Sequence, residues 1–206
     1  ALLGDGALPS YAGYFGAMDA TIANEFSGAL YRFGHTMVNP TLPRYSPDGS
    51  PFPAGHLDLF QSFFHPDSVI SSGGIEPIMQ GQIRELAQEI DPFIVDDLRN
   101  LLFGGGGIGF DLGAFNLQRG RDHGLPSYNN MRKAMKLAPA NTFADISPDP
   151  DIQARLASVY ASPDDVDLWI GALCEPHVPG SSVGQLLHTV FVDQFKRLRD
   201  GDRFFY

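Results

Sequence analysis

The chain of 206 residues has a formal net charge of −10, and 43% of its residues are hydrophobic. This apolar fraction is enough for a folded core and excludes a disordered chain, while the acidic balance argues against a nucleic-acid-binding protein. The single cysteine, Cys174, cannot form a disulfide within the chain or a cysteine-based zinc site, and we expect it to be a small buried residue.

The first strong helical pattern is "DATIANEFSGALYRFGHTMV", and Pro40 lies just beyond it. Its apolar residues recur every three or four positions, which predicts one helix with one apolar face. That face would carry Ile22, Phe26, Leu30, Phe33 and Met37.

The stretch 39–74 is rich in proline and contains "SPDGSP", which predicts a turn or a small hairpin. A helix is expected across "DPFIVDDLRNLLF", with Asp91 as its N-cap and Pro92 in its first turn. Shorter helices are expected around 75–88, 111–119, 126–137 and 151–160.

The segment "SSVGQLLHTVFVDQFKRLRDG" has the clearest helical pattern, and Gly201 is expected to end the helix. Its apolar stripe is interrupted only by Gln194. The stripe consists of Val183, Leu186, Leu187, Val190, Phe191, Gln194, Phe195 and Leu198. With little strand pattern elsewhere, the fold class is predicted to be mainly α.

The run "GGGGIG" at 104–109 contains the spacing G-x-G-x-x-G. A dinucleotide-binding fingerprint needs a strand before these glycines, and here the preceding residues indicate a helix. We therefore interpret the run as a loop between helices.

His35 has two interpretations. On a continuous helix it lies opposite the apolar face, which by itself favours an exposed histidine on a polar surface. However, Gly28 on the same face would leave room for a flat group, and Arg32 precedes His35 by three residues. Imidazole for iron and guanidinium for a propionate are what a haem site requires.

A second stretch, "FDLGAFNLQRGRDHGLPSYNNMRKAM", supports the haem interpretation. Asn116 and Arg119 are three residues apart and would share one helix face. The Asn116 amide oxygen could accept the Nδ1–H of a ligating imidazole. The alternative is a solvated helix end followed by ordinary turn residues.

"LYRFGHTMV" resembles the proximal-histidine helix of the animal-type haem peroxidases, and "FNLQRGRDHGLPSYN" resembles their most distinctive segment. "DLWIGALCEPHVPGSSVGQLL" is similar to their later helices, so the resemblance covers essentially the whole chain in order. The "RGRDHG" wording and the near absence of cysteine favour a bacterial member.

The resemblance implies a mainly α, partial peroxidase fold and gives roles to individual residues. His35 matches the proximal iron ligand, and Asn116 matches the asparagine that orients it. Arg119 matches an arginine near a haem propionate, and Arg32 is a weaker candidate for the same role. Residues 121–123 match a buried polar network that holds a turn.

The family's distal histidine, distal arginine and calcium loop match nothing here, and the resemblance places them upstream. Residues 1–206 are therefore interpreted as the proximal and C-terminal part of one haem peroxidase domain. The implied substrates are hydrogen peroxide and a small reducing donor, and the implied partner is the N-terminal part of the domain. An extracellular location is favoured from the family, and the chain by itself is expected to be inactive.

Two alternatives remain open at this stage. One is a fatty-acid dioxygenase or cyclooxygenase-like haem enzyme, although "RFGHTMV" resembles the peroxidases more closely. The other is a haem-binding or structural fragment without catalysis.

Overall fold

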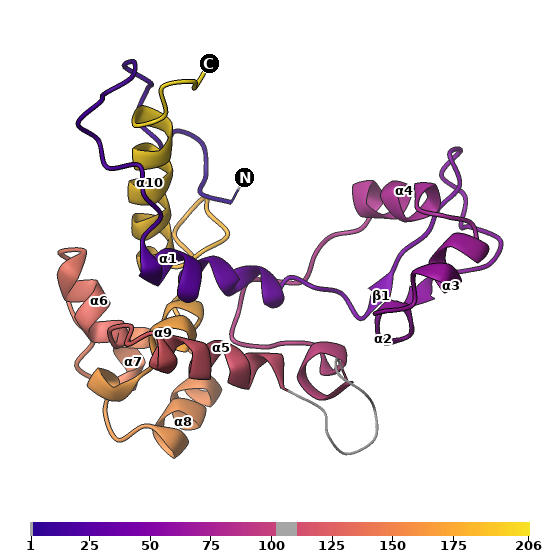
Figure 1. The fold of residues 1–206 in the computed structure, drawn as a ribbon. Coiled ribbons are helices and arrows are strands. Elements are labelled where there is room, and N and C mark those ends of the chain that lie inside the picture. Colours follow the sequence, from indigo (N-terminus) through magenta and orange to yellow (C-terminus); the bar gives the residue numbers. More distant parts are fainter. Residues whose placement is uncertain (1, 102–110) are drawn as a thin grey trace. The chain divides into compact units, whose positions relative to one another are not determined.

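The computed structural model describes residues 2–101 and 111–206, and it is mainly helical, as predicted (Figure 1). The glycine run at 104–109 lies outside the described residues. The contacts divide the chain into two compact units. The first unit comprises Ala1–Phe33, Ile90–Pro92 and Asn116–Tyr206, and the second comprises Gly34–Glu89 and Phe93–Phe115.

The first unit is built from short helices around one longer helix, α10. Its elements are α1 (Asn24–Gly28), the first four residues of the 3-10 helix η1 (Leu30–His35), most of α5 (Leu112–Asp122), α6 (Tyr128–Ala134), α7 (Phe143–Ile146), α8 (Pro150–Val159), the 3-10 helix η3 (Pro163–Asp165), α9 (Leu168–Leu173) and α10 (Gln185–Asp200). The helices predicted near 111–119, 126–137, 151–160 and at the C-terminus are confirmed. The short α7 and α9 were not predicted.

Helix α10 ends at Gly201, as predicted, and its apolar stripe forms much of the core of the first unit. The ring of Phe191 is fully buried, and its centroid lies 5.3 Å from that of Phe26 and 5.3 Å from that of Phe33. These aromatic contacts fix α1 and the start of η1 against α10.

The prediction of one continuous helix through "DATIANEFSGALYRFGHTMV" is wrong. Helix α1 begins only at Asn24, and Ile22 before it is 57% exposed. After α1 the backbone turns at Ala29, with φ −134° and ψ −70°, and continues as the 3-10 helix η1.

The late start of α1 has an identifiable cause. The Gln194 side chain on α10 accepts a hydrogen bond from Ala23 N at 2.9 Å and donates one to Thr21 O at 3.0 Å. These backbone groups are satisfied without a helix, so the extended chain before α1 is held in place. The one polar residue in the predicted stripe is therefore a tether.

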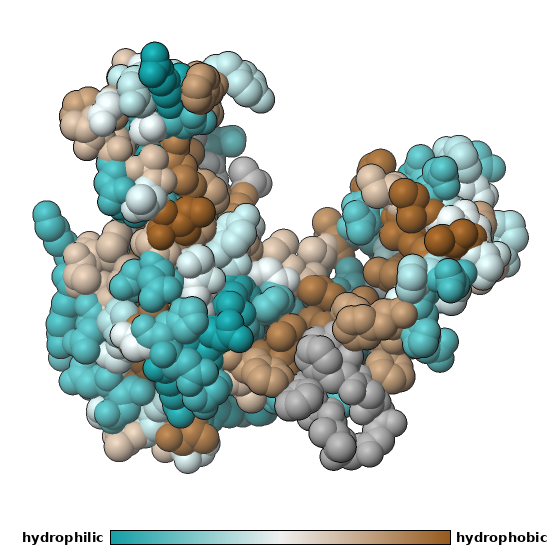
Figure 2. All heavy atoms as spheres, in the orientation of Figure 1, coloured by the Kyte–Doolittle hydropathy of each residue, from teal (hydrophilic) through white to brown (hydrophobic). Residues whose placement is uncertain are grey.

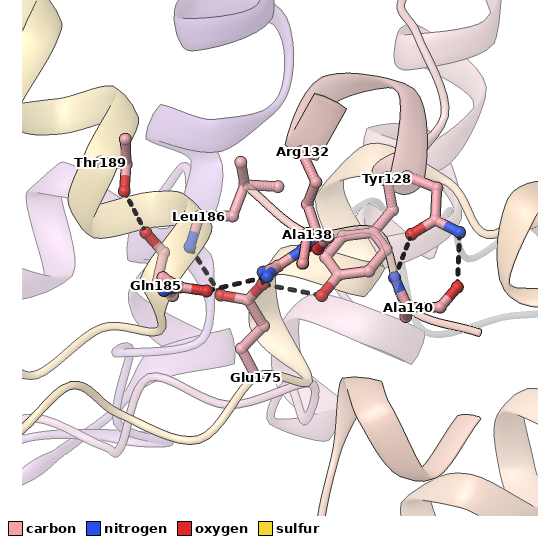
Figure 3. Close-up of polar contacts among 9 residues, drawn as sticks. Tyr128, Arg132, Ala138, Ala140, Glu175, Gln185, Leu186 and Thr189 are labelled. Carbon is pink, nitrogen blue, oxygen red and sulfur yellow. Dashed lines mark hydrogen bonds and ion pairs between the residues drawn. The ribbon is translucent and has the colours of Figure 1, made fainter. Parts of the chain in front are cut away.

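A buried carboxylate joins α6, α9 and α10 (Figure 3). Glu175 forms an ion pair with Arg132 and accepts a hydrogen bond from Tyr128 Oη at 2.7 Å. Its other oxygen accepts from Leu186 N at 2.6 Å, in the first turn of α10. Since Gly184 before α10 has no side chain to cap that helix, Glu175 supplies the cap.

The second unit contains a small antiparallel hairpin and short helices. Its elements are β1 (Thr41–Leu42), β2 (Leu57–Asp58), α2 (Leu59–Ser62), α3 (Pro66–Ser71), α4 (Glu76–Arg84), the start of α5 and the π-helix η2 (Asp97–Leu101). In the hairpin Thr41 pairs with Asp58 and Leu42 with Leu57. The "SPDGSP" turn lies inside it, with Gly49 at φ +88°, so the predicted hairpin is confirmed.

The helix predicted from Pro92 begins later than expected. Ile94 and Val95, whose branched side chains disfavour helix, pack against the buried Leu59 and Leu98. The described helical part is η2, where Asp97 accepts a hydrogen bond from Phe60 N at 3.0 Å. Its carboxylate thereby joins η2 to α2.

Helix α4 presents an exposed apolar row, formed by Ile75, Met79, Ile83 and Leu86, the last two being 76% and 89% exposed. Figure 2 shows hydrophobic surface over the part of the molecule that carries α4. In the described ranges, no helix is both long enough and apolar enough to cross a membrane.

Candidate functional site

Two of the predicted site residues meet in the first unit. Asn116 on α5 is fully buried, and its Oδ1 accepts a hydrogen bond from Arg32 Nη1 of η1 at 3.3 Å. An amide oxygen has two lone pairs, so this contact leaves Asn116 able to accept a second hydrogen bond. The contact joins segments that are 84 positions apart in the sequence.

A third predicted residue, Arg119, adds a second positive charge. Burial, and then the charge of Arg119, lower the pKa of Arg32 from its ordinary value. The Arg32 Nε atom is buried and has no hydrogen-bond partner among the described residues. Nor does either guanidinium form an ion pair with a carboxylate in residues 2–101 and 111–206. Two neighbouring cations and an unmet donor favour an anionic ligand.

His35 is the last residue of η1 and is half-buried. A 3-10 helix has three residues per turn, so Arg32 and His35 project on the same side of η1. The structure therefore brings Arg32, Asn116 and Arg119 together in the first unit, while His35 begins the part of the chain that belongs to the second unit.

The expectation that Gly28 leaves room for a flat group is wrong. A Cβ at this position would lie 3.2 Å from Leu125 Cδ1 and 3.7 Å from His123 Nδ1. Gly28 is buried because the loop between α5 and α6 packs closely against α1. The glycine serves chain packing, not ligand space.

The network predicted at 121–123 exists, but it is not buried. Arg121 donates two hydrogen bonds to Asp167, from Nε at 3.0 Å and from Nη2 at 2.7 Å, and Tyr160 Oη donates to the same carboxylate at 2.7 Å. The Arg121 side chain is 60% exposed. His123 is exposed as well, with Nδ1 3.3 Å from Asn24 Oδ1.

Asp167 was missed by sequence reasoning because it lies 46 residues from Arg121. Burial alone would raise the pKa of Asp167. The hydrogen bonds from Arg121 and Tyr160 outweigh that effect, so the pKa lies below its ordinary value. Cys174 is a buried free thiol, as expected, and burial is the main cause that raises its pKa to about 12.

The chain matches the animal haem peroxidase family over residues 1–206. It is 43% identical over 202 residues to peroxinectin A of Dictyostelium discoideum, covering 98% of this chain and 37% of that relative. The solved structure of peroxidase A from the same organism matches with a TM-score of 0.92 and 43% identity, over 100% of this chain and 39% of that chain.

A solved fatty acid α-dioxygenase of Oryza sativa has a similar fold, with a TM-score of 0.75 and 21% identity over 90% of this chain and 32% of that chain. The chain thus spans less than two fifths of the length of each of these relatives. Full-length family matching and 43% identity to a peroxidase of the same fold lead to one assignment: the chain belongs to the animal haem peroxidase family.

Proposed function

We propose that this chain supplies the proximal side of a haem site in a peroxidase, which reduces hydrogen peroxide while it oxidises a small reducing donor. Family membership supports the haem and the peroxide. The observation that carries the proposal is the pair of guanidiniums, Arg32 and Arg119, beside the buried amide of Asn116.

The described residues fit a haem at this place. Haem carries two propionate carboxylates, and Arg32 has a buried, unpartnered Nε to offer to one of them. A carboxylate near Arg32 and Arg119 would also relieve the repulsion between these cations. His35, on the same side of η1 as Arg32, would provide the imidazole that ligates the iron.

Asn116 would set the character of that imidazole. In this proposal His35 donates its Nδ1–H to Asn116 Oδ1 and presents Nε2 to the iron. The amide is neutral, and Arg32 already draws electron density from its oxygen, so it is a weak acceptor. The imidazole therefore keeps its proton. Bound haem would supply the redox chemistry of peroxide reduction.

The remaining requirements are assigned to parts of a domain beyond these residues. Peroxide reduction needs a base and a cation on the distal side. We propose that the N-terminal part of the domain provides them together with a calcium site, that residues 1–206 form the later part of the same domain, and that the protein acts outside the cell. A peroxidase is preferred to a fatty-acid dioxygenase because identity to the peroxidase structure is 43%, against 21% for the dioxygenase.

The role of the arginines can be tested by binding alone. The chain is titrated with haemin and with haemin dimethyl ester, whose propionates carry no charge. Charge-assisted hydrogen bonds contribute about 1.5–3 kcal/mol each, so haemin should bind about tenfold tighter or more. Arg32→Met and Arg119→Met should each reduce this preference.

The matched control is Arg99→Met, which removes an exposed arginine paired with Asp96 in the second unit. It should leave the preference for haemin unchanged. An equal preference in the wild type and in both site variants would show that these arginines do not bind the propionates.

A further inference from the structure

A cavity of about 160 Å³ lies within the first unit, on the side of α5 that faces α9. It is bounded by α5, by the loop leading into α6, and by the segment that leads from η3 into α9. Its polar and aromatic lining includes Asn116, Arg121, Ser127, Asp165, Asp167 and Trp169. None of these residues is assigned to this cavity by the haem proposal.

Trp169 gives the cavity its chemical interest. The residue is only 4% exposed, and its indole Nε1 is buried without a hydrogen-bond partner among the described residues. Leaving a buried N–H unmet costs about 1–3 kcal/mol. Nearly all buried polar groups in native proteins are paired with protein or with ordered water. An acceptor for this N–H is therefore expected in the adjoining cavity.

The lining selects the kind of acceptor. An apolar molecule would leave the indole N–H unmet. An anion would face the carboxylates of Asp165 and Asp167, while Arg121 is already engaged by both oxygens of Asp167. Water carries no charge and both donates and accepts, so it matches carboxylates and an indole N–H together.

The size agrees with water as well. A water molecule occupies about 30 Å³ in the liquid, so the cavity has the volume of about five. The Ser127 hydroxyl and the two carboxylates offer the further partners that a buried water needs. Small organic acceptors of the same volume would leave some of these groups unpaired.

We propose that this cavity is an internal hydration site, in which an ordered water accepts a hydrogen bond from Trp169 Nε1. The water connects α9 to the wall formed by α5, the helix that carries Asn116. This inference is independent of haem binding and of peroxidase activity, because it concerns the folded first unit alone.

The test uses the fact that the chain has one tryptophan. After labelling with ¹⁵N-tryptophan, the indole gives a single N–H resonance, which Trp169→Phe identifies by removing it. We expect a direct cross-relaxation peak between this proton and water in rotating-frame experiments. Ser127→Ala is the control, because it removes a hydroxyl proton that could relay the signal, and the peak should persist.

A second variant narrows the cavity. A Cβ at Gly120 has only Leu125 Cδ1 within 4 Å, at 3.9 Å, so Gly120→Val can be accommodated and should weaken the water peak. In a crystal structure of the chain, density for water is expected within hydrogen-bond distance of Nε1. An indole proton without water contact, or a crystal structure with a dry cavity, would overturn the proposal.

Discussion

Asn116 lies where a single atom can change the proposed site. The amide oxygen meets a guanidinium at 3.3 Å, so replacement by a carboxylate would form a charged pair with Arg32 and a stronger acceptor for His35. A stronger acceptor makes the imidazole more anionic and stabilises ferric iron. Asn116→Asp should therefore lower the ferric/ferrous reduction potential of the haem-loaded protein.

This potential is measured by spectroelectrochemical titration. The double variant Arg32→Met/Asn116→Asp should show a larger decrease, since the aspartate then lacks the neighbouring cation. A potential that stays constant or rises in Asn116→Asp would contradict the role given to the amide.

Asp167 makes stability depend on pH in a defined window. Its pKa in the folded chain is lowered below the ordinary value of 3.8, so the ionised carboxylate stabilises the fold. That contribution is fully present above the unfolded-state pKa and is lost as the pH falls below about 4. Asp167→Asn should reduce the free energy of unfolding by about 1–3 kcal/mol at pH 6, because hydrogen bonds to a charged group are lost.

The measurement is urea unfolding at several pH values between 6 and 3. The gap between the wild type and Asp167→Asn should shrink as the solution becomes more acidic. Asp151→Asn is the control, since Asp151 pairs with Arg155 in an exposed i, i+4 contact and should change stability by less than about 1 kcal/mol. A gap that is independent of pH would show that Asp167 does not titrate as described.

At the level of helices, the sequence predicts elements that have their own start, stop and stripe. Helix α10 has an apolar stripe over its whole length and Gly201 at its end, so its position could be predicted closely. The short α7 and α9, four and six residues long, contain too few turns to show a period.

The proximal segment shows why pattern alone fails at this site. Its spacing fits a continuous helix, but a side chain 171 positions away holds Ala23 outside it. Tertiary hydrogen bonds therefore decide where α1 begins, and the change to a 3-10 helix decides the direction of His35. Neither effect is visible in a local window of sequence.

Gln194 provides a test of this tether. Gln194→Leu keeps the apolar stripe but leaves Ala23 N and Thr21 O without their partner, so the free energy of unfolding should fall by about 1–3 kcal/mol. Gln194→Glu is the matched comparison, because it keeps an acceptor for Ala23 N and loses only the donor to Thr21 O.

The measurement is denaturant unfolding together with amide hydrogen exchange at Ala23. Protection of this amide should be lost in the leucine variant and retained in the glutamate variant. Equal stability of all three proteins would remove Gln194 as the cause of the late start of α1.

For the molecule as a whole, the family motifs predicted the mainly α fold and the meeting of Arg32 with Asn116. They could not predict long-range partners such as Asp167, since nothing near Arg121 in the sequence specifies them. The cavity beside Trp169 was equally invisible, because it depends on how α5 and α9 pack.

The whole chain also allows a prediction about turnover. The chain covers 39% of the peroxidase structure that it matches, and we have assigned the distal base and cation to other parts of the domain. Without them, bound haem receives help on one face only. Guaiacol oxidation by the 206 residues with haemin should stay close to that of free haemin. A much faster rate that His35→Ala abolishes would show that the chain holds a complete site.

The central claim is that His35 ligates the haem iron, and the resonance Raman spectrum of the ferrous, haem-loaded protein tests it most directly. We predict an iron–histidine stretching band in the wild type that disappears in His35→Ala, returns when imidazole is added, and is unchanged in His65→Ala, which replaces an exposed histidine of the second unit. A band of unchanged position and intensity in His35→Ala would contradict the account.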